Sequence, residues 1–338
     1  MYKISLITGD GIGPELSESV TELLHVINDK IGVKLEISTV EAGDNTLKKT
    51  GKALPDSTLD TIKKSDVCLK APVGESAADV IVVLRRMLDL YANIRPAKSY
   101  PNMPALKENI DLVIVRENTE DLYTGMEFDV GKTAIALRTI SEHASKRIAK
   151  YAFMTARQRN GKKKVTCVHK SNVMRKTDGL FARSCAEVAK DFGDISFDQM
   201  YVDACAMNLI RQPDSFDVIV TTNLFGDILS DEAAQVVGGL GMAPAANIGE
   251  KFALFEPVHG AAFDIAGKQA ANPSSFILST KMMFEWLAMK NNDAKSVKVA
   301  KMIEEAVYGV VGEGFRTKDV GGNKTTKEFT QKVISKLT

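Results

Sequence analysis

Short apolar runs alternate with helix-like segments along most of this sequence, and this rhythm restricts the chain to a wound α/β fold. The apolar runs expected as strands are residues 4–8, 34–40, 67–71, 112–116, 165–169 and 217–221. The segments with helical periodicity are residues 15–29, 59–64, 77–90, 141–158, 179–191 and 223–238. Strands that alternate with helices of roughly 10–15 residues are typical of a largely parallel sheet with helices packed on its faces.

Residues 122–140 interrupt this alternation with a β-rich segment. Turn signals at Gly125 and Gly131 divide it into short extended pieces, which predicts a hairpin that projects from the α/β body. Such a hairpin is available as a contact between two copies of the chain. At roughly 150 residues per domain, 338 residues suggest about two domains.

Charge balance and cysteine spacing restrict the partners and the compartment. Lys and Arg number 44 and Asp and Glu 43, so the net charge of +1 provides no field that would draw the protein to nucleic acid or to a membrane. No run approaches the ~18 apolar residues of a membrane span, and the amino-terminal residues resemble a strand rather than a secretion signal. The four cysteines are scattered singly, which favours buried thiols in a reducing cytoplasm.

Neither common nucleotide-binding glycine motif is present. In the turn at residues 8–15, Pro14 stands where a GxGxxG motif starting at Gly9 requires its last glycine. Pro14 instead suits the first turn of a helix. The Gly-Lys-Thr sequence at 131–133 resembles the end of a P-loop, but Met126 occupies the position of its first glycine.

Asp227 and Asp231 lie four residues apart in a segment that we expect to be helical. Their Cβ atoms would be about 5–6 Å apart on one helix face, opposite the apolar residues. This periodicity alone fits a solvated face. The alternative is a cation site, because carboxylate oxygens are ligands that Mg²⁺ and Mn²⁺ prefer, and Asp203 at the end of a strand-like run could complete it.

Three arginines lie on expected elements or beside them: Arg85, Arg95 and Arg116. A guanidinium group binds a carboxylate through two parallel hydrogen bonds. Each arginine alone fits a surface position, but three that converge would suit a substrate with several carboxylates.

Six motifs, in order over nearly the whole chain, carry a resemblance to a known family. They are GDGIGPE (9–15), YANIRPAKS (91–99), RENTEDLY (116–123), HKSNVM (169–174), NLFGDILSDE (223–232) and EPVHGAAFDIAGKQAANP (256–273). Together they resemble the β-decarboxylating dehydrogenases, which include isopropylmalate, isocitrate and homoisocitrate dehydrogenases, and they are most similar to archaeal members that oxidise isopropylmalate. The resemblance implies a two-domain α/β fold and a metal-assisted, NAD(P)-dependent oxidation of a 2-hydroxy acid that loses its β-carboxylate.

The same resemblance implies roles for individual residues. The three arginines would hold the substrate carboxylates. Tyr123 would protonate the enol after decarboxylation, and Lys170 would take the hydroxyl proton. Asn172 would contact the substrate or the nicotinamide ribose. The expected ligands of Mg²⁺ or Mn²⁺ are Asp203, Asp227 and Asp231.

A shared site and a discontinuous domain are further implications. Lys170 and Asp203 would reach across from the neighbouring subunit of a homodimer, with a tetramer as a possible higher assembly. Residues 1–90 and 238–338 would form the cofactor-binding domain. Residues 91–237 would form the substrate, metal and dimerisation domain, with the β arm near 122–140.

The loop at 256–273 replaces a Rossmann fingerprint in this family. The residues expected around the cofactor are Val73, Glu75, His259, Gly260, Ala261, Ala262, Asp264, Ile265 and Asn272. Asp264 favours NAD over NADP, because a carboxylate accepts hydrogen bonds from a ribose 2′-OH and repels a 2′-phosphate. Relatives that use NADP tend to carry Lys and Tyr at the positions of Asp264 and Ile265.

The helix before Arg85 bears on the choice of substrate. Ile81 and Val82 offer an apolar wall suited to an isopropyl group, and Asp79 would oppose a third substrate carboxylate. This favours 3-isopropylmalate, although the two apolar residues could also simply pack the helix onto the sheet. The loop at 72–76 is shorter than in bacterial relatives that oxidise isopropylmalate, so isocitrate and homoisocitrate remain alternatives. A non-catalytic regulatory subunit is a third hypothesis, which the presence of Tyr123 disfavours.

Overall fold

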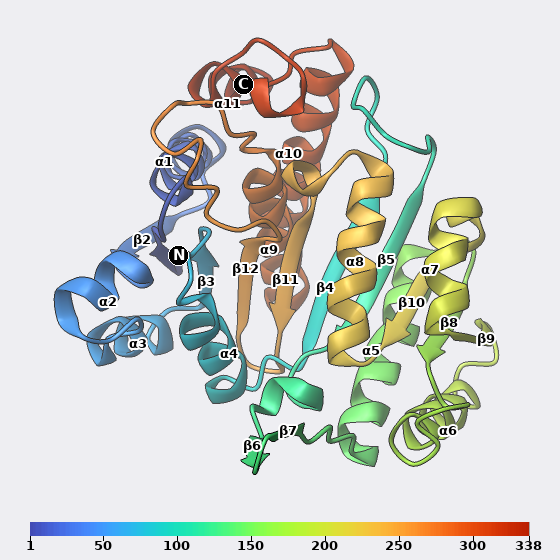
Figure 1. The fold of residues 1–338 in the computed structure, drawn as a ribbon. Helices are drawn as coiled ribbons and strands as arrows, with labels where there is room; N and C mark the ends of the chain where they lie inside the picture. Colours follow the sequence, from blue (N-terminus) through green and yellow to red (C-terminus); the bar gives the residue numbers. More distant parts are fainter. Residues whose placement is uncertain (338) are drawn as a thin grey trace.

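One long sheet forms the centre of the molecule. The computed structural model describes residues 1–337. Its main strands are β1 (Tyr2–Ile7), β2 (Leu35–Val40), β3 (Val67–Lys70), β4 (Ala92–Lys98), β5 (Asp111–Glu117), β8 (Lys164–His169), β9 (Ser196–Tyr201), β10 (Val218–Thr221), β11 (Pro244–Ile248) and β12 (Ala253–Pro257). They form a ten-stranded sheet in the order β2-β1-β3-β12-β11-β4-β5-β10-β8-β9 (Figure 1).

The sheet is largely parallel, as the alternating pattern predicts, but its centre is antiparallel. Strand β11 pairs antiparallel with both β12 and β4, and β4 pairs antiparallel with β5. The remaining neighbours are parallel. Strands β11 and β12 are consecutive in the chain and joined by a tight turn, in which Gly249 N donates to Phe252 O at 2.9 Å. A turn this short leaves no room for the crossover helix that a parallel pair requires.

Eleven α-helices surround the sheet in the described part of the chain. They are α1 (Gly13–Val26), α2 (Asp44–Thr50), α3 (Asp56–Lys63), α4 (Ala77–Met87), α5 (Glu142–Arg159), α6 (Thr177–Ala189), α7 (Val202–Arg211), α8 (Asn223–Val237), α9 (Ser274–Asn291), α10 (Ala294–Gly312) and α11 (Thr326–Ser335). Pro14 lies in the first turn of α1, as expected. No helix among residues 1–337 is long and apolar enough to cross a membrane.

Strand β5 shows how alternation builds the layers. Val113 and Val115 pack in the same apolar cluster as Phe153 of α5. Leu112 and Ile114 point to the other face and join a second cluster with residues of α7 and α8. Because successive side chains of a strand point to opposite faces, both sides of the sheet are covered, and the four central residues of β5, Leu112 to Val115, are all apolar. Figure 1 shows α8 and α7 lying across the front of this part of the sheet.

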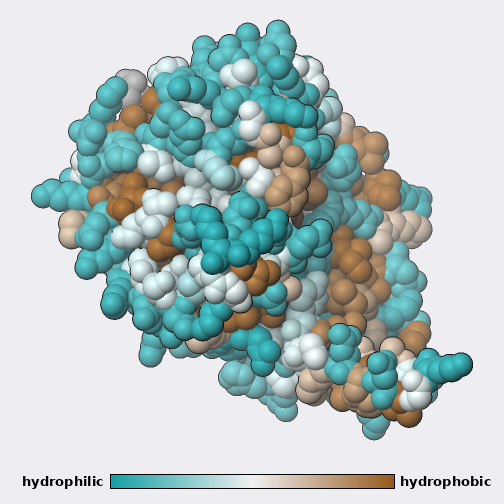
Figure 2. Space-filling view, turned by 60° about the vertical axis from the view of Figure 1, so that its left-hand side comes forward, coloured by the Kyte–Doolittle hydropathy of each residue, from teal (hydrophilic) through white to brown (hydrophobic). Residues whose placement is uncertain are grey.

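The hairpin predicted over residues 122–140 is present but shorter. Strands β6 (Glu127–Val130) and β7 (Thr133–Ala136) pair antiparallel around Gly131, and the residues before them form a short 3₁₀ helix, η2 (Asp121–Thr124). The hairpin lies below the body of the molecule (Figure 1). Its exposed apolar residues include Phe128 and Val130. Figure 2 shows hydrophobic surface on the projection at the lower right and in a band above it.

Of the expectations for the cysteines and for Asp203, the first is confirmed and the second is not. The four cysteines are free and buried, as predicted. The expectation that Asp203 ends a strand is wrong: β9 ends at Tyr201, and Asp203 lies in the first turn of α7. Tyr201 is still extended while Val202 begins the helix, so the strand-like run 200–203 spans the boundary of two elements.

Candidate active site

Three buried arginines converge from α4, β4 and β5. Arg85, Arg95 and Arg116 are 6%, 8% and 1% exposed. Burial, together with the charges of Arg95 and Arg85, lowers the pKa of Arg116 to about 9. Three guanidinium groups brought this close together favour an anionic ligand.

Asp227 of α8 neutralises part of this charge. Its Oδ1 accepts a hydrogen bond from Arg116 Nη1 and lies 3.1 Å from Arg95 Nη1. Burial acts to raise the pKa of Asp227, but the arginines and the hydrogen bond from Tyr123 outweigh it and the pKa is lowered. Asp227 therefore stays ionised in the cluster.

Tyr123 completes this group from the short helix η2. Its hydroxyl donates to Asp227 Oδ2, and its ring lies against Arg116, whose Cζ is 5.0 Å from the ring centroid. Burial and the Asp227 carboxylate raise the pKa of Tyr123, against the opposing charge of Arg116. The phenol is therefore protonated near neutral pH and available as an acid.

Two residues that the sequence does not mark as part of the site lie against Arg116. Asn223 Oδ1 accepts from Arg116 Nε and Nη2 at 3.0 and 2.7 Å. A Cβ at Gly226 would lie 2.5 Å from Arg116 Cγ, so α8 can approach the arginine only where it carries a glycine. Both residues stand in the motif 223–232, and no local pattern distinguishes them from an ordinary helix start.

Asp231 lies one turn beyond Asp227 on the same helix face. Its Oδ1 is 3.3 Å from Arg95 Nη1, and burial raises its pKa. The two side chains are 35% and 54% exposed, so they border the arginine cluster and still reach solvent. Two carboxylates with hard oxygen donors beside a cluster of arginines fit Mg²⁺ or Mn²⁺ bound together with a substrate.

Asp203 is not part of that group within one chain. No set of three or more His, Cys, Asp or Glu side chains among residues 1–337 could hold a metal ion. Asp203 instead pairs with Lys170, Oδ1 to Nζ at 2.5 Å, and this hydrogen bond lowers the pKa of Asp203. Lys170 follows β8, and Asn172, two residues on, is exposed. In the described structure no hydrogen bond or ion pair joins Lys170 to the arginine cluster.

A buried charged network lies behind Arg85. Arg85 donates to Asn247 Oδ1 at 2.9 Å and to Glu256 Oε1 at 3.3 Å. Lys70 Nζ lies 2.8 Å from Glu256 Oε2, and both residues are buried. Burial would raise the pKa of Glu256, but Lys70 and Arg85 outweigh it and lower it to about 2. No local sequence pattern indicates this network, because its members come from four separate elements.

Loops at the ends of β1, β3 and β12 pack together where the cofactor is expected. Ile12 N donates to Ala261 O at 2.8 Å, and a Cβ on Gly11, whose φ is +57°, would lie 2.0 Å from the same oxygen. Asp10, fully buried, accepts from Gly74 N at 3.2 Å and from Asp44 N at 2.8 Å. Gly11 and Asp10 thus hold the loops together without a Rossmann turn.

The residues assigned to the cofactor differ in their exposure. Gly260, Ala262, Asp264 and Glu75 are exposed, His259 and Ile265 are half-buried, and Val73, Ala261 and Asn272 are buried. The side-chain oxygen Oδ1 of Asn272 already accepts from Ser274 N at 2.9 Å. Asp264 has its carboxylate at the surface, and its backbone oxygen accepts from Lys268 Nζ at 2.7 Å.

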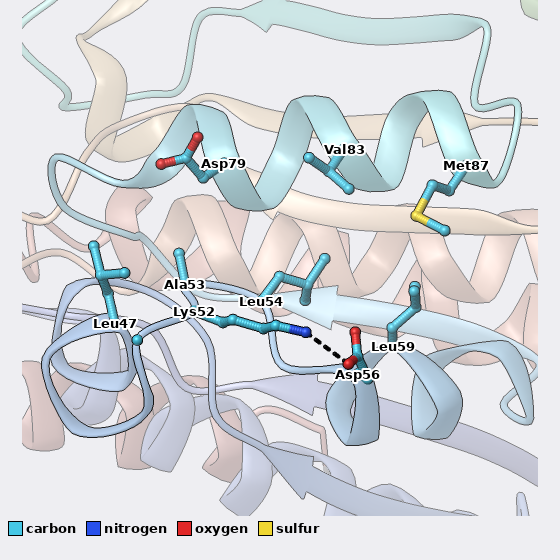
Figure 3. Close-up of a pocket in the computed structure, with 10 residues that line it drawn as sticks. Leu47, Lys52, Ala53, Leu54, Asp56, Leu59, Asp79, Val83 and Met87 are labelled. Atoms are coloured by element: carbon cyan, nitrogen blue, oxygen red, sulfur yellow. Dashed lines mark hydrogen bonds and ion pairs between the residues drawn. The ribbon is translucent and has the colours of Figure 1, made fainter.

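Helix α4 presents different residues on its two sides. Ile81 is buried in an apolar cluster and Val82 is partly buried against it. Asp79, Val83 and Met87 line a hollow of ≈ 400 Å³ on the outer side, facing the segment before α3 (Figure 3). Asp79 therefore lies on the outer side of α4, and its opposition to a third substrate carboxylate remains a prediction.

Three arginines from α4 and the adjacent central strands β4 and β5, with Tyr123 and two aspartates beside them, form a site in an α/β fold that suits an acid with several carboxylates. The chain belongs to the isocitrate/isopropylmalate dehydrogenase family, whose model matches residues 3–333. It is 52% identical, over 99% of both chains, to a 3-isopropylmalate dehydrogenase of Sulfurisphaera tokodaii. It is also 52% identical, over 100% of both, to one of Archaeoglobus fulgidus. Among solved structures it is similar to isocitrate dehydrogenase from Methylococcus capsulatus, with a TM-score of 0.92 and 41% identity over 100% and 99% of the two chains.

Proposed function

We propose that this dehydrogenase oxidises 3-isopropylmalate, the (2R,3S) isomer, with NAD and releases CO₂ and 4-methyl-2-oxopentanoate, a step of leucine biosynthesis. The observation that carries the proposal is the group of Arg85, Arg95 and Arg116 around Asp227 and Tyr123. The names of the archaeal relatives support this substrate.

The arginines would bind the two carboxylates of the substrate. In the structure Arg95 and Arg116 hold the carboxylate of Asp227 in the same manner. A substrate carboxylate would replace that contact with a similar charge-assisted hydrogen bond. Val82, which is partly buried against the apolar cluster of Ile81, would contact the isopropyl group, with Ile81 behind it.

Asp227 and Asp231 would hold Mg²⁺ or Mn²⁺ together with Asp203 of the partner subunit. When bound, the ion would supply Lewis-acid polarisation of the substrate hydroxyl and of the ketone that follows. The pairing of Asp203 with Lys170, away from the other two aspartates, supports a site completed by a second chain.

Lys170 would accept the hydroxyl proton while the hydride on the same carbon moves to NAD⁺. Loss of the β-carboxylate breaks a carbon–carbon bond and leaves an enol, and Tyr123 would donate its proton to the carbon that lost CO₂. The raised pKa of Tyr123 keeps that proton in place near pH 7. Asn172 would lie beside the substrate or the nicotinamide ribose.

The loop at 256–273 would bind NAD, with Asp264 at the ribose. Residues 1–90 and 238–338 would form one domain and 91–237 the other, and closure between them would exclude water from the substrate. The free, buried cysteines are compatible with a cytoplasmic location.

A homodimer, or a tetramer built from it, would bring Lys170 and Asp203 of one chain to the arginine cluster of the other. Exposed apolar residues lie on the elements that would meet: Phe128 and Val130 on the arm, Met207 and Ile210 on α7, and Ile228 on α8. Exposed apolar side chains concentrated on neighbouring elements are typical of a protein–protein contact.

The second candidate is oxidation of isocitrate or homoisocitrate. The burial of Ile81 favours it, because a side chain in the core contributes less of an apolar wall. A steady-state comparison of kcat/KM for the three acids, with NAD or NADP and Mg²⁺, separates the candidates. A higher value for either tricarboxylate than for 3-isopropylmalate would overturn the first proposal.

A further inference from the structure

Arg138 lies at the end of the arm and contacts two buried aspartates at once. Its Nε donates to Asp121 Oδ1 at 2.6 Å, and its Nη1 pairs with Asp178 Oδ1 at 2.5 Å. Nη2 donates to Thr222 Oγ1 at 2.8 Å, and the guanidinium lies 4.8 Å from the centre of the Phe225 ring. Asp121 and Asp178 are both 0% exposed, so Arg138 is the counter-charge that permits their burial.

Asp121 connects Arg138 to the segments of Tyr123 and Asp227. Its Oδ1 accepts from Leu122 N at 2.9 Å, next to Tyr123, and its Oδ2 accepts from Leu224 N at 3.0 Å, in the first turn of α8. Asp121 itself has a φ of +73°, an uncommon conformation for a residue with a side chain. Such strain persists only where the surroundings fix the backbone, which these contacts do.

Asp178 connects Arg138 to the segment of Lys170. Its Oδ2 accepts from the backbone N of Lys170 at 2.5 Å, while its Oδ1 is bound by Arg138. One guanidinium thus holds two carboxylates, and these hold the backbone N–H groups of Leu122, Leu224 and Lys170.

We propose that Arg138 is a positioning residue for the acid Tyr123 and the base Lys170, acting through Asp121 and Asp178. This inference rests on the proposed function, in which these two groups move the protons. If the active sites are shared, Tyr123 and Lys170 of one chain serve different sites, and Arg138 couples the geometry of one site to that of the other.

The arrangement separates positioning from substrate binding. In the described structure the side-chain hydrogen bonds of Arg138 go to Asp121, Asp178, Met174 and Thr222, and none of these residues is hydrogen-bonded to Arg85, Arg95 or Arg116. A change at Arg138 should therefore lower kcat more than it alters the KM for the acid. A purely structural role would instead lower the amount of folded enzyme, or change both constants together.

The first test compares Arg138→Lys with Arg147→Lys. Arg147 is a matched control, since it also contacts a carboxylate (Asp89, both oxygens at 2.9 Å), a threonine hydroxyl and an aromatic ring. In the described structure it forms no hydrogen bond or ion pair with Asp121, Asp178 or the two proton-transfer groups. For Arg138→Lys we expect kcat to fall about 10- to 100-fold with KM within about threefold, as a small misplacement of reacting groups requires. Arg147→Lys should keep kcat within about twofold. Equal effects of the two substitutions, or an unchanged kcat in Arg138→Lys, would overturn the proposal.

The second test separates the connection to Lys170 through Asp178 from the connection to Tyr123 through Asp121. It uses the variants Asp178→Asn and Asp121→Asn. With substrate deuterated at the carbon that loses hydride, Asp178→Asn should raise the kinetic isotope effect, because removal of the hydroxyl proton by Lys170 accompanies hydride transfer. Asp121→Asn should lower kcat with no such rise, because Tyr123 acts later. The same isotope effect in both variants would contradict the assignment of branches.

Hydrogen–deuterium exchange tests, without measuring activity, whether Arg138 fixes these segments. In Arg138→Lys, peptides that contain the amides of Leu122, Lys170 and Leu224 should exchange faster than in wild type, and in Arg147→Lys they should not. Unchanged exchange at all three would overturn the inference. If wild type oxidises none of the acids, the proposed function fails, while the exchange result still decides whether Arg138 fixes these segments.

Discussion

Glu256 is the buried carboxylate on which two cationic side chains depend, so Glu256→Gln should strongly destabilise the protein. The substitution leaves Lys70 and Arg85 buried without their counter-charge. Removing one member of a buried ion pair typically raises the free energy of the folded state by about 3–5 kcal/mol. We expect a loss of this size in the free energy of unfolding at pH 7, measured by urea denaturation.

The pH dependence of stability provides a second estimate of what Glu256 contributes to the free energy of unfolding. The pKa of Glu256 falls from 4.5 to about 2 on folding, and at about 1.4 kcal/mol per unit this corresponds to about 3 kcal/mol. A depressed carboxyl pKa stabilises the fold above the unfolded-state value and loses that contribution as pH falls toward the folded-state value. The difference between wild type and Glu256→Gln should therefore be constant above about pH 5 and shrink between about pH 4.5 and 2.

The exposed pair of Lys52 and Asp56 offers a control of the same chemistry. Asp56→Asn should change the free energy of unfolding by less than about 1 kcal/mol, because solvent screens a surface ion pair. The reasoning is refuted if Glu256→Gln costs no more than this control. A difference from wild type that stays constant from pH 5 to pH 3 would also refute it.

Three further predictions concern the site. Tyr123→Phe should lower kcat about 10²- to 10⁴-fold with little change in substrate KM, measured in steady state, because it removes only the donated proton; an unchanged kcat would assign the acid elsewhere. Gly226→Ala places a methyl group 2.5 Å from Arg116 Cγ, so KM for the acid should rise while KM for NAD stays constant. An unaltered KM for the acid would show that helix α8 can move away from Arg116. Exchange of Asp264 for Lys together with Ile265 for Tyr should shift the ratio of kcat/KM from NAD toward NADP, and an unchanged ratio would exclude Asp264 as the cofactor determinant.

The local sequence pattern is sufficient to predict the helices and strands that carry the site. It is not sufficient to predict the contacts between them. Helices α4 and α8 and strand β5 were expected within a few residues of their observed bounds, because apolar periodicity and neighbouring turns mark them. The antiparallel β11–β12 pair was not, since the sequence beyond residue 238 was interpreted by motif alone. Glu256 is the first residue of the motif at 256–273, yet its partner Lys70 is 186 residues away. Contacts between distant elements leave no local signal, and the same holds for Arg138.

The continuous hydrogen bonding across the centre of the sheet has a mechanical consequence. Strand β11 is bonded on one edge to β12 and on the other to β4, so the two ends of the sheet are not joined by a free linker. Any change in the angle between those ends must therefore twist or bend paired strands, which resist deformation elastically. A molecule built in this way would return by itself to one resting shape once the force that closed it is removed.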